Sequence, residues 1–147
     1  MRNKSTVAVC TILAVLVLPV VADAQPPAAA MNRASASTLA ARVEQRLNRQ
    51  HAEFAITPGE EALWTQYAQV TRANARDMSA LFAQRKAALS SMNATDNMHS
   101  LAAIAAQHAR AMQRLDAAFT ALYAAMPPAQ QHTTDAAIRA YSLRSRP

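Results

Sequence analysis

Apolar residues recur at alternating spacings of three and four over the longest periodic stretch of the chain, between Met98 and Met126. This spacing places them along one side of a helix in the manner of a heptad seam, so it predicts a long helix that packs through that side. The seam comprises Met98, Leu101, Ala105, His108, Met112, Leu115, Phe119, Leu122 and Met126.

Three further helices are expected from the same type of pattern. Helix one is predicted from about Thr38 to Ala55, with Leu39, Val43, Leu47 and Phe54 recurring at helical spacing. Helix two carries Trp64, Tyr67, Thr71, Met78, Leu81, Phe82, Leu89 and Met92. Helix four is predicted to start near Pro128, and its expected buried residues are Ile138 and Tyr141.

Two similar short stretches, "ITPGE" at Ile56–Glu60 and "MPPAQ" at Met126–Gln130, precede helix two and helix four. In the first, Thr57 suits an N-cap, Pro58 suits the first helical position, and Glu60 stands three residues after the cap, which is a capping-box arrangement. In the second, Pro128 suits the first turn and Gln130 takes the role of Glu60. Both stretches are therefore predicted helix starts.

Few turn residues interrupt these helices, because no proline lies between Pro58 and Pro127 and Gly59 is the only glycine. Asn93–Asp96 is the predicted break between helices two and three, with Thr95 or Asp96 as the cap. Helix two, of about 34 residues, would be about 50 Å long. A compact globule of this chain length has a radius of gyration of only about 14 Å.

The sequence therefore predicts an all-α, elongated four-helix fold built on an antiparallel hairpin. Such a thin bundle cannot bury all of its apolar surface alone, so we expect dimerisation, an exposed binding face, or both.

The first 24 residues have the layout of a secretory signal peptide. Arg2 and Lys4 form a basic start, an apolar run covers residues 7–18, and small residues end the segment at Ala22 and Ala24. This predicts export to the periplasm with cleavage after Ala24; a retained membrane anchor is the alternative reading, but the run is short for a membrane span. Residues 25–37 are predicted to form a flexible segment, and residues 38–143 the helical domain.

Export would leave a chain without cysteine, because Cys10 lies in the signal segment. Removing Arg2, Lys4 and Asp23 from 15 basic and 9 acidic residues leaves 13 and 8, a net charge of +5. This charge favours anionic partners in general. The charge does not by itself indicate a nucleic-acid partner. The sequence contains no second apolar segment of membrane length, so we expect no stable membrane insertion.

Motifs for catalysis are absent: there is no glycine-rich loop, no nucleophile elbow and no evident carboxylate pair, so we expect no enzyme activity and no cofactor. Two metal ligands on one helix face must stand three or four residues apart. Two pairs have this spacing: His108 with Met112, and His132 with Asp135. No His-x-x-x-His pair exists. We therefore favour core packing over metal binding for His108 and Met112, and keep the metal site as an alternative.

Arginines form two stripes. Arg42, Arg46 and Arg49 share one stripe of helix one, and Arg72 and Arg76 share one of helix two. Glu53 stands four residues from Arg49, whereas no acid stands four residues from Arg72 or Arg76. The stripes are either an ordinary solvated face or a basic rim that attracts acidic, partly unfolded polypeptide, with Leu39 and Met78 as apolar neighbours that would hold it.

The two short stretches resemble the paired Leu-Thr-x-x-Gln signature of the Spy/CpxP family of bacterial periplasmic proteins, and the resemblance covers essentially residues 38–142. The motif positions are Ile56, Thr57, Glu60, Met126, Pro127 and Gln130. Ile56 stands in place of Leu and Glu60 in place of Gln; in the second copy, Met126 and Pro127 replace Leu and Thr. Pro127 has no hydroxyl, so the second cap must be satisfied differently.

The resemblance implies an antiparallel homodimer of bent hairpins that forms a cradle and acts as an ATP-independent chaperone for unfolded client proteins. Relatives instead repress an envelope-stress sensor kinase or bind metal ions such as zinc, and both remain alternatives. On the chaperone reading, the client-binding residues are Arg42, Arg46, Arg49, Arg72, Arg76, Leu39 and Met78.

Overall fold

The structure, a computed structural model, describes the backbone of residues 28–144 and the side chains of residues 37–143. The predicted signal peptide, residues 1–24, lies outside the described residues. The described part consists of helices without strands, which confirms the all-α fold class. The helices are α1 (Ala28–Glu53), α2 (Glu61–Ala88), the 3-10 turn η1 (Leu89–Ser91), α3 (Ala94–Ala125) and α4 (Pro128–Arg144).

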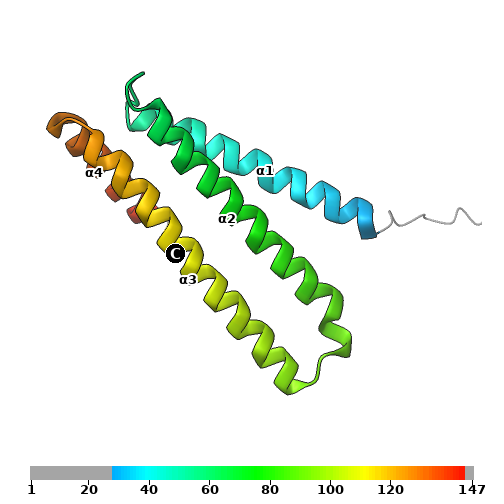
Figure 1. Ribbon diagram of the computed structural model, residues 1–147. Helices are drawn as coiled ribbons and strands as arrows, with labels where there is room; N and C mark the ends of the chain where they lie inside the picture. Colours follow the sequence, from blue (N-terminus) through cyan, green and yellow to red (C-terminus); the bar gives the residue numbers. More distant parts are fainter. Residues whose placement is uncertain (1–27, 145–147) are drawn as a thin grey trace, which may run out of the picture.

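Helices α2 and α3 run antiparallel, joined through η1 at one end (Figure 1). Helix α1 packs along α2, and α4 turns back after α3 and contacts α1. The α1–α2 turn and the α3–α4 turn therefore lie at the same end of the molecule. No helix in the described part of the chain is long and apolar enough to cross a membrane.

The start of α1 differs from the prediction. The helix begins at Ala28, ten residues before the expected start at Thr38. The segment "AAAMNRASAS" contains no glycine or proline after Pro27, and alanine is the strongest helix former, so nothing in these residues stops the helix at Thr38.

The caps also differ from the prediction. Asn93 is the N-cap of α3: its side chain accepts a hydrogen bond from Asp96 N–H at 2.9 Å, and the Asp96 carboxylate accepts from Asn93 N–H at 3.3 Å. The expectation that Thr95 or Asp96 caps this helix is wrong, because Asp96 occupies the third helical position of the capping box.

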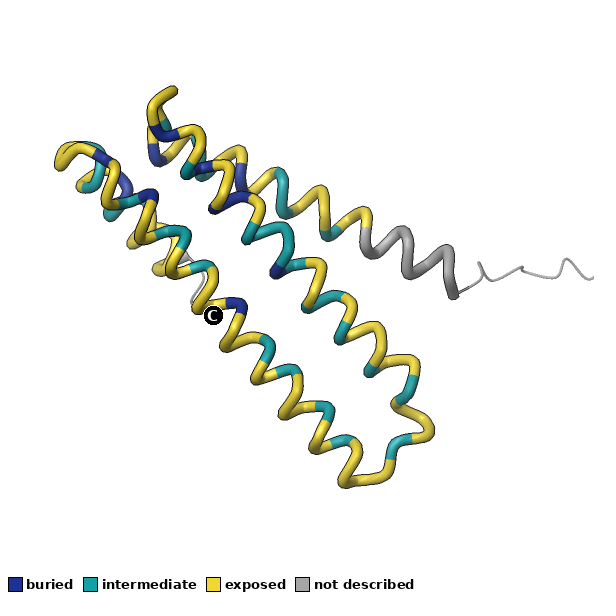
Figure 2. Tube along the Cα trace, viewed as in Figure 1, coloured by how far each residue is buried: buried dark blue, intermediate teal, exposed yellow. Residues whose placement is uncertain are grey.

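The core is concentrated at the end that holds the two inter-helix turns, where Figure 2 shows most of the buried positions. Aromatic rings form its centre: Trp64 lies edge-on to Phe54 with centroids 6.4 Å apart, and Tyr67 lies 5.9 Å from Phe119. The buried cluster consists of Leu47, Phe54, Trp64, Tyr67, Ala68, Leu122 and Met126. This cluster anchors all the helix ends that meet there.

The predicted seam of α3 packs only over part of its length. Leu122 and Met126 are buried, whereas Met98 is 63% exposed and His108 is exposed. A straight α-helix drifts by roughly 20° per heptad from a strict seven-residue repeat, and Met98 lies four heptads before Met126. The stripe therefore rotates away from α2, and the prediction that all of it packs is wrong.

Polar side chains connect α2 to α3 along the part of α3 whose apolar stripe no longer faces α2. The buried Asn74 donates to the carbonyl of Ala111 at 2.8 Å and accepts from Arg114 at 2.8 Å. Arg114 also forms an ion pair with Asp77 at 3.2 Å. Further along, Arg85 donates to the hydroxyl of Ser100 at 3.1 Å. These hydrogen bonds thus link α2 and α3 beyond the buried apolar cluster.

Candidate functional site

The two motif stretches, far apart in sequence, meet in space. The side-chain amide of Gln130 donates to the carbonyl oxygens of Phe54 and Ala55, at 2.9 and 3.2 Å, and to the Glu60 carboxylate at 2.9 Å. We predicted that Gln130 would take at α4 the role that Glu60 takes at α2. It reaches across to the first motif instead, and so ties the α3–α4 end to the α1–α2 turn.

Glu60 is the polar centre of this contact and is only 5% exposed. Its carboxylate accepts the backbone N–H of Thr57 at 2.9 Å, which is one half of the predicted capping box. Burial acts to raise the pKa of Glu60, but the hydrogen bonds from Gln130 and Thr57 outweigh it, so the pKa lies below its ordinary value. The prediction that Thr57 is the N-cap of this helix and Pro58 its first residue is wrong, because α2 begins at Glu61 and Glu60 is at its N-cap position.

The remaining motif residues have packing roles. Met126 is 3% exposed and belongs to the core, and its sulfur accepts from the hydroxyl of Thr134 at 3.5 Å. Ile56 is partly buried against the same core. Pro127 is exposed, and its carbonyl accepts the N–H of Gln131 at 3.0 Å.

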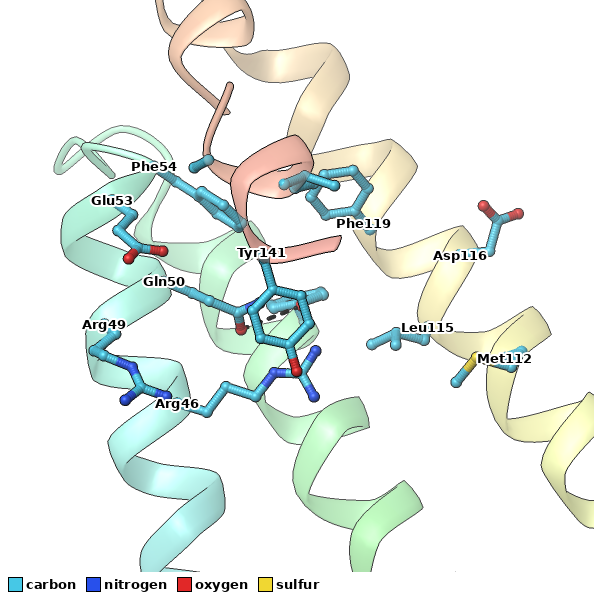
Figure 3. A pocket seen from close by; sticks show the side chains of 13 residues that line it. Arg46, Arg49, Gln50, Glu53, Phe54, Met112, Leu115, Asp116, Phe119 and Tyr141 are labelled. Carbon is cyan, nitrogen blue, oxygen red and sulfur yellow. Dashed lines mark hydrogen bonds between the residues drawn. The ribbon is translucent and has the colours of Figure 1, made fainter. Parts of the chain in front are cut away.

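A first groove opens beside the core between α1, α3 and α4, with a volume of about 680 Å³ (Figure 3). Apolar and aromatic side chains line most of it, and four charged side chains lie along it. The lining residues are Arg46, Arg49, Gln50, Glu53, Phe54, Tyr67, Met112, Leu115, Asp116, Phe119, Ala137, Ile138 and Tyr141. We call this space the aromatic groove.

Helix α4 places Ile138 and Tyr141 at the mouth of the aromatic groove. Both were predicted to be buried, but they are 39% and 48% exposed, so that prediction is wrong. The guanidinium of Arg46 lies over the Tyr141 ring, 5.2 Å from its centroid, in cation–π contact.

A second groove, of about 350 Å³, lies between α1 and α2. It brings together three of the sequence-predicted binding residues, Leu39, Arg72 and Arg76. Most of its other lining side chains are small, including Ala40, Ala75, Ser79, Ala80 and Ala83. We call it the α1–α2 groove.

Arg72 is not the uncompensated charge that its sequence neighbourhood suggested. It forms a two-point ion pair with Glu44 of α1, at 2.7 and 2.8 Å. The hydrogen bond from Arg72 lowers the pKa of Glu44, and the same bond raises the pKa of Arg72. The acid comes from the neighbouring helix, so a search for partners four residues away on the same helix could not find it.

The predicted binding residues therefore do not form one surface. Arg46 and Arg49 line the aromatic groove, whereas Arg72, Arg76 and Leu39 line the α1–α2 groove. Arg42 is exposed and Met78 is half-buried, and neither lines a groove.

The candidate metal ligands do not cluster. His108 and Met112 lie on the exposed side of α3, and His132 is exposed on α4, while Asp135 accepts a hydrogen bond from the Tyr123 hydroxyl at 3.2 Å. Within residues 37–143, no group of three or more His, Cys, Asp or Glu side chains is placed to hold a metal ion.

Sequence reasoning missed the aromatic groove itself. The periodic pattern predicts helix packing for Phe54, Tyr67 and Phe119, and it assigns no role to Gln50. The structure places all four along the groove. No spacing rule within one helix predicts a space that side chains of four helices line together.

The chain matches no family model, no curated protein and no solved structure among those compared with it.

Proposed function

We propose that the protein is a periplasmic, ATP-independent chaperone of the Spy/CpxP type, which binds unfolded proteins and suppresses their aggregation. The observation that supports this most is a set of large apolar side chains left in solvent on the outer half of the hairpin, in α2, η1 and α3. These are Phe82, Leu89, Met98 and Leu101, each at least 43% exposed. We call them the apolar row.

Exposure of this kind is costly for a protein that has nothing to cover it. Large apolar side chains gathered on one part of a soluble chain are available for an interaction, and covering apolar surface recovers about 25 cal/mol per Å². An unfolded client exposes the complementary apolar segments. Binding through such surface needs no nucleotide and is reversible.

Charge supports the same proposal. The exposed Arg42 and Arg76 form no ion pair with a carboxylate in residues 37–143, and the net charge of the exported chain is expected to be positive. Long-range attraction of acidic, partly unfolded chains would raise the rate of encounter, and the apolar row would then hold them.

The proposed working form is an antiparallel homodimer whose paired hairpins form a cradle. A second copy would cover part of the apolar row and leave the rest facing a client. The dimer is part of the proposal because the thin outer half of the hairpin buries little by itself.

Light scattering tests the chaperone activity. The purified chain, without nucleotide, should suppress aggregation of a chemically reduced client near equimolar ratio, and high salt should weaken the effect because it screens encounter. The double variant Arg42→Glu/Arg76→Glu should suppress less than a charge-matched control that reverses Arg139 and Arg110. If the unmodified chain leaves client aggregation unchanged at a several-fold molar excess, the proposal is wrong.

A further inference from the structure

The aromatic groove differs in kind from the apolar row, since it is a recess with a fixed floor. Phe54 and Tyr67 are buried, at 2% and 5% exposure, and Phe119 lies against both, with centroid distances of 6.1 and 5.9 Å. Because these rings pack on each other at steep angles, the floor is rigid. A ligand that binds against this floor would not have to immobilise these side chains.

Apolar side chains continue from the floor to the mouth. Leu115 is partly buried, whereas Met112 and Ile138 at the edges remain 44% and 39% exposed. The volume of about 680 Å³ lies in the range typical of small-molecule sites. The space therefore suits the aliphatic or aromatic part of a small ligand.

Donors gather on the α1 edge of this recess. Arg46 and Arg49 line it, and within residues 37–143 neither forms an ion pair with a carboxylate, in contrast to Arg72 and Arg114. In Figure 3 the Arg46 side chain extends across the groove beneath the Tyr141 ring. Gln50 accepts from the Tyr67 hydroxyl at 3.4 Å, which leaves its amide nitrogen without an acceptor among the described residues.

The acidic residues of the lining do not cancel this edge. Asp116 lies on α3, across the groove from the arginines, and its carboxylate points away from Arg46 in Figure 3. Glu53 lies one turn beyond Arg49 on α1, toward the closed end, and forms no ion pair with it. Neither carboxylate therefore pairs with Arg46 or Arg49.

We propose that the aromatic groove binds a small amphiphile with one anionic headgroup, of the fatty-acid type. The headgroup lies against Arg46, Arg49 and the Gln50 amide, and the aliphatic body covers Phe54, Phe119 and Leu115. A guanidinium matches a carboxylate with two parallel hydrogen bonds, which selects an acid over an alcohol of equal length. This ligand site goes beyond client holding, which the proposed function assigns to the apolar row.

Trp64 supplies an intrinsic reporter for the test. It is the only tryptophan of the chain, and it packs edge-on against Phe54 of the groove floor, with centroids 6.4 Å apart. Titrations below the micellar concentration would use dodecanoate, dodecyltrimethylammonium and dodecanol, followed by tryptophan fluorescence and by calorimetry. Dodecanoate should bind saturably, one per chain, and at least tenfold more tightly than the other two.

Charge reversal on the α1 edge identifies the site. Arg46→Glu should weaken dodecanoate binding at least tenfold, and Arg46→Gln should weaken it less. The matched control Arg76→Glu reverses an arginine of the α1–α2 groove and should leave the affinity within twofold. Circular dichroism and thermal unfolding of each variant would show that the fold is retained.

The proposal is overturned if dodecanoate does not saturate, or if the cationic amphiphile binds equally well. It is also overturned if Arg46→Glu and Arg76→Glu have the same effect on a folded protein, because binding would then follow net charge. Loss of amphiphile binding with client holding intact separates this site from the chaperone activity.

Discussion

Gln130 joins three parts of the chain that no local rule connects. Its amide reaches the carbonyls of Phe54 and Ala55, directly after α1, and the Glu60 carboxylate just before α2. The orphan carbonyls at the end of a helix need donors, and here a residue about 75 positions away provides one. The two motifs are therefore two halves of one contact, which holds the core end of the molecule together.

Replacing Gln130 with Ala should lower the free energy of unfolding by about 1–3 kcal/mol, since partly buried acceptors lose their donor. Urea denaturation followed by circular dichroism measures this. Gln113→Ala, an exposed glutamine on α3, serves as the control and should change stability little. Equal effects of the two substitutions would contradict the clamp role of Gln130.

Ala55 adopts a φ of 51°, in the left-handed region that favours glycine. The N–H of Ile56 donates to His51 and that of Ala55 to Ala52, at 3.2 and 3.1 Å, so α1 ends in a Schellman motif with Ala55 at the glycine position. Ala55→Gly should therefore raise stability by up to about 1 kcal/mol, after allowance for the greater freedom of glycine in the unfolded chain.

The control for this substitution is Ala52→Gly within the same helix, which should lower stability by about 0.5–1 kcal/mol. Thermal unfolding compares the two variants. Destabilisation by both would mean that the α1 terminus does not hold Ala55 in the left-handed conformation.

At the scale of elements, side-chain caps determine the residue at which a helix begins. Thr95 and Asp96 are the caps that the sequence analysis expected at the hairpin tip, but propensity alone does not rank them strongly against a neighbouring Asn. The structure uses Asn93 because Asp96 then returns a hydrogen bond to the Asn93 backbone.

Asn93→Ala should reduce the free energy of unfolding by about 0.5–2 kcal/mol through loss of the cap, whereas Thr95→Ala should leave it nearly unchanged. Chemical denaturation of both variants distinguishes the two cap assignments. A larger loss in the Thr95 variant would place the start of α3 two residues later than the structure has it.

The whole molecule has a closed end with an aromatic core and an outer half that contains few buried residues (Figure 2). The apolar row lies on that outer half, so its side chains contribute little to the stability of the monomer. Function proposed for the row can therefore be tested without unfolding the protein.

The triple variant Phe82→Gln/Leu89→Gln/Met98→Gln should change monomer stability by no more than about 0.5 kcal/mol per site, as is usual for exposed positions. It should nevertheless suppress client aggregation much less than the unmodified chain. Leu122→Ala is the contrasting control, since this leucine is fully buried and its truncation should cost about 2–5 kcal/mol. Full chaperone activity in the triple variant would remove the apolar row from the mechanism.

Much of this protein follows from its sequence alone. The periodicity and the near absence of glycine determine the helical class, and Pro128 marks the start of α4, because these signals act within a few residues of each other along one helix. Tertiary structure decided the rest. Glu44 pairs with Arg72, and Gln130 donates hydrogen bonds to the first motif stretch and the residues before it. The apolar stripe of α3 rotates away from α2. Each of these depends on the distance and rotation between helices, which a one-helix pattern does not contain.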